Sequence, residues 1–403
     1  MSHTANSSHS RLIQLDVLRA LAILLVMGRH LGTYPSQAGS LRPVAELWYR
    51  FGWTGVDLFF VLSGFLIGGL LFHELRTRGT LDVRRFLVRR IFKIWPAYFV
   101  YIGFVFVTFG LMDPRHSPWH AARLLLPNCL HVQNYWGLEW TAHTWSLAIE
   151  EHFYLALPLL LMLIARRRPG GSDSLSPVPL IAVAVIISCT AWRTYTSMYY
   201  YSPPFGWSYL LSRTQMRIDS LFFGVLLGYL YHFRPHLLER VGRHRLALIF
   251  VGLLMIAPMM VLEMETTRFV VTVGLTLLYL GYGCILLAAL YAPPRVFRGA
   301  LARAAALVGS FSYSIYLWHV EASWRSAGIL GSLATFSHLS GGTRWVVATI
   351  VYVLVAFSAG VVLGRLVERP ALALRERLFP ARADALAQEP PDAASATALV
   401  ASA

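Results

Sequence analysis

The sequence predicts an all-α, polytopic integral membrane protein with about ten transmembrane helices and both termini in the cytoplasm. Of the 403 residues, 56% are hydrophobic and 14% are charged, whereas an average soluble domain is about 25% charged. The apolar residues recur in runs of about 20, the length that a helix needs to cross a bilayer. The basic residues gather in particular loops between these runs, which is typical of multi-pass membrane proteins.

Ten apolar runs along the chain are long enough to be membrane-spanning helices. The ninth is polar for such a helix, because it contains SYSIYLWHVEASWRSAG. The expected boundaries of the ten spans are 15–33, 53–72, 94–112, 143–164, 178–197, 213–231, 246–262, 268–290, 307–329 and 344–367.

The distribution of basic residues predicts the orientation. If the N-terminus is cytoplasmic, four loops that together hold 17 Arg or Lys residues lie inside, namely 73–93, 165–177, 232–245 and 291–306. The outside loops 34–52 and 113–142 together hold four. Because cytoplasmic loops carry an excess of Lys and Arg, both termini are expected inside.

One membrane domain is expected at 11–380, between a short disordered N-terminus at 1–10 and a disordered C-terminal tail at 381–403. The net charge of +15 is compatible with nucleic-acid binding, but its placement in alternate loops favours a membrane protein. We therefore expect membrane lipids, and no nucleic acid, as partners. The three cysteines lie far apart with no paired spacing, so no metal site, redox motif or permanently bound cofactor is predicted.

The first span carries two residues that are costly in lipid, Arg19 and His30. Eleven positions turn an α-helix by about 1100°, so the two side chains share a face and lie about 16 Å apart along the axis. Such groups usually face a protein interior or an aqueous cavity and mark function. The alternative is that both lie at the ends of the helix, with Arg19 extending to the interface.

A basic amphipathic stretch, DVRRFLVRRIFKIWP, leads into the third span. Its helical spacing pairs Arg85 with Arg89, and Arg90 with Lys93, on shared faces. The stretch is either an interfacial helix that contacts anionic lipid or a cytoplasmic phosphate site, because guanidinium groups bind phosphates bidentately. Pro96 predicts a break or kink between this stretch and the span.

Further ionisable residues occur in the second, fourth and sixth spans. Asp57 needs a partner in the membrane, and the glycines of FVLSGFLIGG after it predict close helix packing. His143 and Glu150 of HTWSLAIEEHFY are seven positions apart and are expected on one helix face; the alternative places them at the interface. Arg217 and Asp219 are close enough in sequence for a local ion pair.

The ninth span contains SYSIYLWH, in which Tyr316 and His319 are three positions apart and are expected to share a helix face. For its tyrosines the alternative is an aromatic belt at the membrane interface. Six residues in these spans are candidates for substrate or structural support: Asp57, Ser146, Arg217, Asp219, Tyr316 and His319.

Taken in order, these motifs resemble the acyltransferase-3 family of polytopic membrane acyltransferases, which acylate sugars and other hydroxyl-bearing acceptors. The resemblance covers roughly 11–370. It rests on LDVLRA with an R-x10-H spacing to His30, GVDLFFVLSGFLI, RRFLVRRIFKIWP, TWSLAIEEHFY, RIDSLFFG, SYSIYLWH and the closing ERP. One motif departs from the family, which often has R-x-x-R before the proline where this chain has Arg90 and Lys93. Lysine keeps the charge but lacks the planar fork of arginine.

The resemblance implies an O-acetyltransferase that moves an acyl group, most often acetyl, from cytoplasmic acyl-CoA to a hydroxyl of a sugar or glycoside. His30 is implied as the catalytic group, either as a general base toward the hydroxyl or as a carrier of the acyl group. Glu150 is implied to orient His30 or to assist proton transfer. The co-substrate acyl-CoA is expected to be held near the inner face by Arg19, Arg85, Arg89, Arg90 and Lys93.

The implied location is the inner membrane of a bacterium, with a carbohydrate acceptor and with polysaccharide-assembly proteins as further partners. A transporter or flippase of a polysaccharide or lipid-linked sugar is the alternative, because such bundles also carry intramembrane charges. Transporters often contain inverted repeats, and no internal repeat is visible in this sequence. Turnover of radiolabelled acyl-CoA separates the two classes.

Overall fold

The predicted all-α class is confirmed. The computed structural model describes residues 13–32, 35–136, 139–167, 175–200 and 211–379, and the regular elements of these stretches are all helices. The two termini that were predicted to be disordered lie outside the described residues. The helices are α1 (Ile13–Arg29), α2 (Arg42–Phe51), α3 (Gly55–Arg78), α4 (Val83–Val105), α5 (Pro118–Cys129), α6 (Gln133–Trp136), α7 (Trp145–Arg167), α8 (Val178–Tyr199), α10 (Thr214–Phe233), α11 (Pro235–Gly242), α12 (Arg245–Ile256), α13 (Pro258–Val261), α14 (Leu275–Leu290), α15 (Ala300–Ser310), α16 (Ser312–Gly331), α17 (Ala334–Ser337), α18 (Gly341–Leu363) and α19 (Arg369–Leu378).

Six helical segments of the described residues are long and apolar enough to cross a membrane, or up to eight if each of two bent helix pairs forms one span. The number of ten and the cytoplasmic termini therefore stay predictions. Helix α1 occupies the first expected span but has 17 residues, at the lower limit for a hydrocarbon core about 30 Å thick. The ninth expected span is not one straight helix, because α15 and α16 meet at an angle of 76°.

The basic stretch and the third expected span form one helix. Helix α4 begins at Val83 and continues through Pro96 to Val105, so the helix does not break at Pro96, and the alternative of a kink there stays a prediction. A proline removes one backbone donor, and helices packed in a membrane protein tolerate this loss when neighbouring groups compensate. Asp82 caps the helix, accepting a hydrogen bond of 3.0 Å from the backbone N–H of Arg85.

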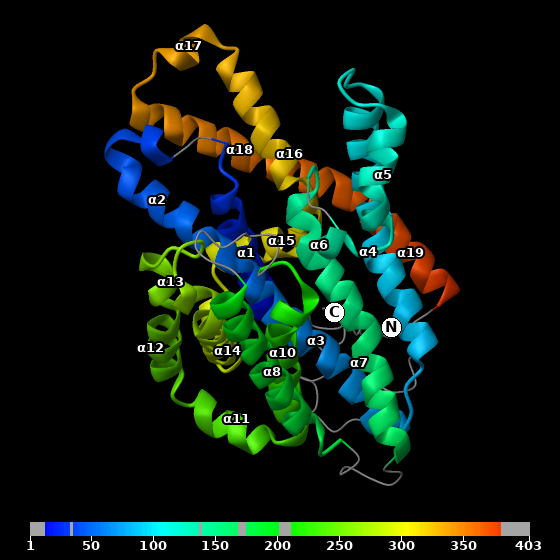
Figure 1. The fold of residues 1–403 in the computed structure, drawn as a ribbon. Coiled ribbons are helices and arrows are strands. Elements are labelled where there is room, and N and C mark those ends of the chain that lie inside the picture. Colours follow the sequence, from blue (N-terminus) through cyan, green and yellow to red (C-terminus); the bar gives the residue numbers. More distant parts are fainter. Residues whose placement is uncertain (1–12, 33–34, 137–138, 168–174, 201–210, 380–403) are drawn as a thin grey trace, which may run out of the picture.

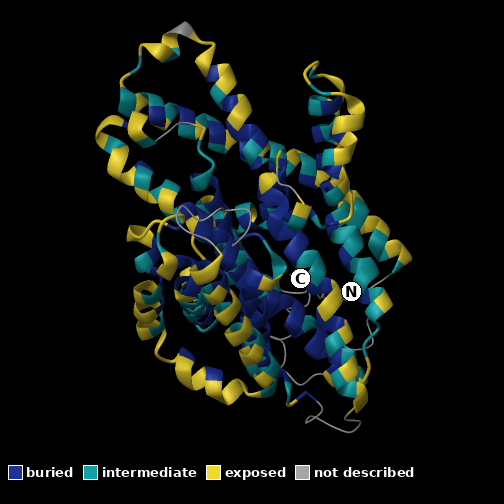
Figure 2. Cartoon of the chain, viewed as in Figure 1, coloured by how far each residue is buried: buried dark blue, intermediate teal, exposed yellow. Residues whose placement is uncertain are grey.

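Helix α3 lies at the centre of the molecule, in the most buried part of the structure (Figure 1, Figure 2). One hydrophobic core lies between α3 and the helices α1, α4, α7 and α16, and a second lies between α3, α10 and α14. The predicted close packing of the glycines is confirmed, because a Cβ on Gly64 would collide with the backbone of Leu221 on α10. The contact is reciprocal, since a Cβ on Gly224 would collide with the backbone of Val61.

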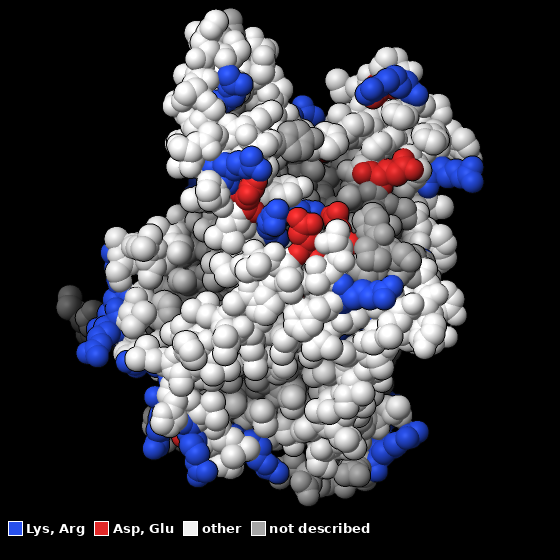
Figure 3. All heavy atoms as spheres, turned by 60° about the vertical axis from the view of Figure 1, so that its left-hand side comes forward, with Lys and Arg blue, Asp and Glu red and all other residues white. Residues whose placement is uncertain are grey.

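The surface of the molecule fits a membrane environment. On the face in Figure 3, a largely uncharged region lies between the charged side chains at mid-height and above and the basic side chains at the lower end. Helix α12 exposes Leu246, Phe250 and Leu254, which are four positions apart and so form one apolar stripe. Exposed apolar surface of this kind is rare in soluble proteins. Two lobes at the upper end of this face flank a hollow (Figure 3).

Candidate active site

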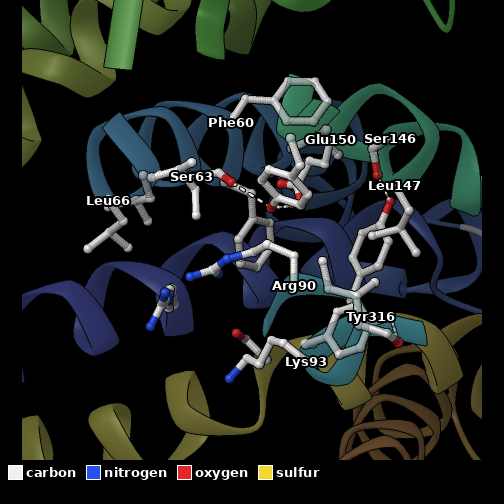
Figure 4. A pocket seen from close by; sticks show the side chains of 18 of the residues that line it. Phe60, Ser63, Leu66, Arg90, Lys93, Ser146, Leu147, Glu150 and Tyr316 are labelled. Carbon is white, nitrogen blue, oxygen red and sulfur yellow. Dashed lines mark hydrogen bonds between the residues drawn. The ribbon is translucent and has the colours of Figure 1, made fainter. Parts of the chain in front are cut away.

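A cavity among α1, α3, α4, α7 and α16 encloses about 1000 Å³, including its open mouth, and is called the arginine cavity here. Figure 4 shows its side chains, with apolar groups from α3 and polar groups from α4 and α7. A cavity with apolar walls and a few converging polar groups is the usual form of a small-molecule site. Its polar lining consists of Arg19, Ser63, Arg90, Lys93, Ser146, Glu150, Tyr154, Ser310, Ser312, Tyr313, Tyr316 and Glu368.

Three of the predicted phosphate ligands face the arginine cavity. Arg90 is buried on α4, and Lys93 lies about one turn further along the same helix (Figure 4). Arg19 projects from α1 and forms an ion pair of 3.3 Å with Asp16. Three cations inside partly apolar walls attract an anion strongly, and guanidinium groups suit phosphate in particular. This arrangement favours the phosphate-site interpretation of the basic stretch.

Glu150 also faces the arginine cavity, beside a tyrosine. The hydroxyl of Tyr154 donates a hydrogen bond of 2.7 Å to Oε2 of Glu150 and lies 2.9 Å from Oγ of Ser63 (Figure 4). In the described part of the chain, no hydrogen bond or ion pair joins Glu150 to His30. Glu150 therefore makes no direct contact that could orient the His30 ring. Its part in proton transfer stays a prediction.

His30 lines a second cavity, of about 620 Å³, which we call the histidine cavity. The His30 ring packs edge-on against His319 with ring centroids 5.0 Å apart, and His319 lies 5.2 Å from His143. Nδ1 of His319 is 2.6 Å from the carbonyl oxygen of Tyr316, and Nε2 of His143 is 3.1 Å from that of Leu317. These contacts hold the rings of His319 and His143 in place near His30.

The two cavities adjoin at two residues. Val56 and Tyr316 line both of them, and we call this place the shared wall. The Tyr316 hydroxyl donates a hydrogen bond of 2.5 Å to the carbonyl oxygen of His143 and lies 2.7 Å from Oγ of Ser146. Tyr316 and Ser146, both predicted to give support, thus fix this wall. The histidine cavity beyond this wall is lined by His30 and His143 together with Arg29.

The remaining two predicted phosphate ligands lie outside the arginine cavity. Neither Arg85 nor Arg89 lines it. Successive residues of a helix are about 100° apart, so Arg89 points away from the direction of its neighbour Arg90. Arg89 faces α19 instead, with its guanidinium 3.0 Å from Oε1 of Glu376. Of the five predicted phosphate ligands, three thus line the arginine cavity and two do not.

Asp57 has the partner that its burial requires, but the expected local pair within the sixth span is wrong. Arg217 lies 2.8 Å from Asp57 on α3, and Asp219 lies 2.8 Å from Arg193 on α8. Arg217 and Asp219 are two positions apart, about 200° around the helix, so they point in opposite directions. All four are buried, and none lines either cavity. Their support is structural, between helices.

Three residues to which the sequence analysis assigned no role contact the site or its supporting residues. They are His143, which contacts His319, Tyr154, which contacts Glu150, and Arg193, which contacts Asp219. His143 was recognised as ionisable and was expected to share a helix face with Glu150. It lies in the 3-10 turn Ala142–Thr144 directly before α7, and it lines the histidine cavity, whereas Glu150 lines the arginine cavity. Among the described residues, no group of three or more His, Cys, Asp or Glu side chains is placed to hold a metal ion.

The fold and the two cavities define a multi-pass helical membrane protein with an internal polar site. A family model described as an acyltransferase domain matches residues 12–369, and the chain therefore belongs to the acyltransferase-3 family. It is similar to the O-acetyltransferase OatA of Staphylococcus aureus (strain NCTC 8325 / PS 47) and to OatA of strain COL, each at 27% identity over 325 residues. Each match covers 76% of this chain and 49% of the relative, so the chain spans about half the length of these proteins. No solved structure matches it.

Proposed function

We propose that this chain is a membrane O-acetyltransferase that moves an acetyl group from acetyl-CoA to a carbohydrate hydroxyl. One observation carries the proposal: a cavity lined by three cations and a cavity lined by His30 meet at the wall of Val56 and Tyr316. A site for an anionic donor next to a site for proton transfer is what acyl transfer requires. The names of the relatives, which are O-acetyltransferases, support acetyl as the group and oxygen as the acceptor atom.

The donor binds in the arginine cavity. Its pyrophosphate pairs with Arg19, Arg90 and Lys93, which face the same space. Its pantetheine arm follows the apolar side chains of α3 toward the shared wall. Arg19 lies on α1 and His30 directly follows the last residue of this helix, so the two are about 16 Å apart along the helix axis, which leaves room for an extended arm between the phosphates and the thioester.

The acceptor hydroxyl binds in the histidine cavity, where His30 removes its proton. The acceptor oxygen attacks the thioester carbonyl, a new C–O bond forms, and the C–S bond breaks. The proton on His30 passes to the departing sulfur, which leaves as the free thiol of CoA. His319, packed against His30 at 5.0 Å, positions the imidazole and does not itself react.

The proposed location is the bacterial cytoplasmic membrane, with the arginine cavity open to the cytoplasm. The basic N-terminal part of α4, which carries Arg84, Arg85 and Arg89, supports this orientation, because positive charge favours the cytoplasmic side. Polysaccharide-assembly proteins are proposed partners on the acceptor side.

The test is transfer by the purified chain in detergent. The chain is incubated with radiolabelled acetyl-CoA and cell-envelope glycans, and base-labile label in the carbohydrate is counted. We expect saturable acetyl-CoA binding and ester-linked label that depends on both substrates. A protein that neither binds acetyl-CoA nor forms labelled ester, yet moves sugar across proteoliposomes, would be a transporter, and the proposal would be wrong.

A further inference from the structure

Helix α19 holds an arginine cluster beside the arginine cavity. It begins at Arg369, where the family match ends, and it packs against α4, as Figure 1 shows. Arg375 on α19 and Arg89 on α4 share one carboxylate, that of Glu376. Oε1 of Glu376 accepts hydrogen bonds of 2.6 Å from Arg375 and 3.0 Å from Arg89, and Arg89 also donates to the carbonyl oxygen of Phe379 over 2.8 Å.

This cluster lies next to the proposed donor site along both helices. Glu368, which lines the arginine cavity, directly precedes α19, and Arg375 follows seven residues later, about 10 Å along the helix. On α4, Arg89 is the neighbour of Arg90, which faces the cavity. The arginine cluster and the cations that line the arginine cavity are therefore adjacent but distinct.

The charges of the cluster do not balance. In the part of the chain that the structure describes, the guanidinium groups of Arg89 and Arg375 pair with the one carboxylate of Glu376, so these three side chains together carry a net positive charge. The Glu376 side chain is 42% exposed, whereas those of Arg375 and Arg89 are 16% and 25% exposed. The anion is thus the most accessible member. A carboxylate held by two partly buried guanidinium groups occupies the position that a phosphate would take, since both anions accept the same bidentate hydrogen bonds.

Acyl-CoA carries two separate phosphate groups, the pyrophosphate and the 3′-phosphate of its ribose. Resting on the proposed function, we infer that Arg89 and Arg375 form a second phosphate subsite that binds the 3′-phosphate of acyl-CoA. Glu376 fills this subsite when the donor is absent and moves aside when the donor binds. Arg375 thereby lets the enzyme distinguish CoA from dephospho-CoA, which lacks only the 3′-phosphate.

The test compares the dissociation constants of CoA and dephospho-CoA for the full chain in detergent. We expect the unmodified protein to prefer CoA about tenfold, which corresponds to about 1.4 kcal/mol. Arg375→Ala removes this preference by weakening CoA binding alone. Glu376→Gln, which removes the competing charge but keeps the side-chain shape, tightens CoA binding several-fold and leaves dephospho-CoA unchanged. The matched control is Arg377→Ala on the same helix, whose exposed side chain lies outside the cluster, and it keeps the tenfold preference.

The outcomes separate this inference from the proposed function. If CoA and dephospho-CoA bind equally tightly, or if Arg375→Ala keeps the preference, the cluster only fastens α19 to α4 and the subsite is refuted, while the acetyltransferase proposal stands. If Arg375→Ala lowers retention of phosphatidylglycerol in nanodiscs and leaves the CoA preference intact, the subsite binds a lipid headgroup, and the inference is wrong. If neither nucleotide binds, both the subsite and the proposed function fail.

Discussion

His30 lies within a set of side chains that come from three separate segments of the chain. Its ring contacts His319 of α16, which in turn contacts His143 of the turn before α7. The sequence identified His30 because a histidine in an apolar run is costly without a function. It placed Tyr316 and His319 on one helix face by their spacing. The sequence could not predict the contact between His143 and His319, because these residues are far apart in the chain and helical spacing applies only to near neighbours.

The same limit explains the position of Glu150. A carboxylate in an apolar run predicts a polar surrounding, which Tyr154 and Ser63 provide. Local spacing does not say which of two neighbouring cavities such a carboxylate faces. Only the packing of α7 against α3 and α4 directs Glu150 into the arginine cavity, away from the His30 ring.

At the residue scale, we predict that His319→Ala lowers kcat about 10- to 100-fold and leaves the KM for acetyl-CoA unchanged. General-base catalysis contributes about 10²–10⁴-fold, and the variant removes the ring that positions the base without removing the base. Steady-state kinetics with radiolabelled acetyl-CoA measure both constants. His338→Ala is the control, because this histidine follows α17 and is exposed. Equal kcat values for His319→Ala and the unmodified chain would show that His319 has no part in positioning.

At the scale of the elements, the sequence predicted most helices but not how they end or bend. The continuous course of α4 through Pro96 depends on its packing, which the isolated stretch does not reveal. The bend between α15 and α16 lies within an expected single span. Near the bend, Gly309 packs so closely on the backbone of Asp16 that a Cβ would collide with it, and local spacing does not predict this tertiary contact. By contrast, the glycines of α3 predicted a close helix contact correctly, because small residues have few other uses in such a helix.

The ion pair between Asp57 and Arg217 joins α3 to α10 beside this glycine contact. We predict that Arg217→Met lowers the free energy of unfolding by about 3–5 kcal/mol, because it leaves the buried Asp57 charge unpaired. Adding Asp57→Leu should recover most of this loss, since an apolar pair replaces the ionic one. Thermal unfolding in detergent measures both effects.

A matched control for this pair is Arg50→Met. Arg50 lies 3.2 Å from Glu263, and the two side chains are 46% and 52% exposed. Removing an exposed pair costs at most about 1 kcal/mol. If Arg217→Met is no more destabilising than Arg50→Met, the buried pair does not hold α3 and α10 together.

At the scale of the whole molecule, composition alone indicated a helical membrane protein, and the motifs indicated the family that the comparison confirms. Two features could not be predicted from the sequence. One is the division of the polar residues into two cavities with a shared wall, which requires five helices to pack at once. The other is the contact of Arg89 with Glu376, which depends on where α19 docks. Both features follow from tertiary contacts between segments far apart in the chain.

The central claim is that donor binding and proton transfer occupy different cavities. The most direct test measures the dissociation constant of acetyl-CoA and the rate of acetyl transfer for two variants, His30→Ala and the double variant Arg90→Ala with Lys93→Ala. We predict that His30→Ala binds acetyl-CoA as tightly as the unmodified chain but transfers acetyl at least about 10²-fold more slowly. The double variant should bind acetyl-CoA about tenfold more weakly or worse. Near-normal transfer by His30→Ala, or unchanged acetyl-CoA binding by the double variant, would contradict the account.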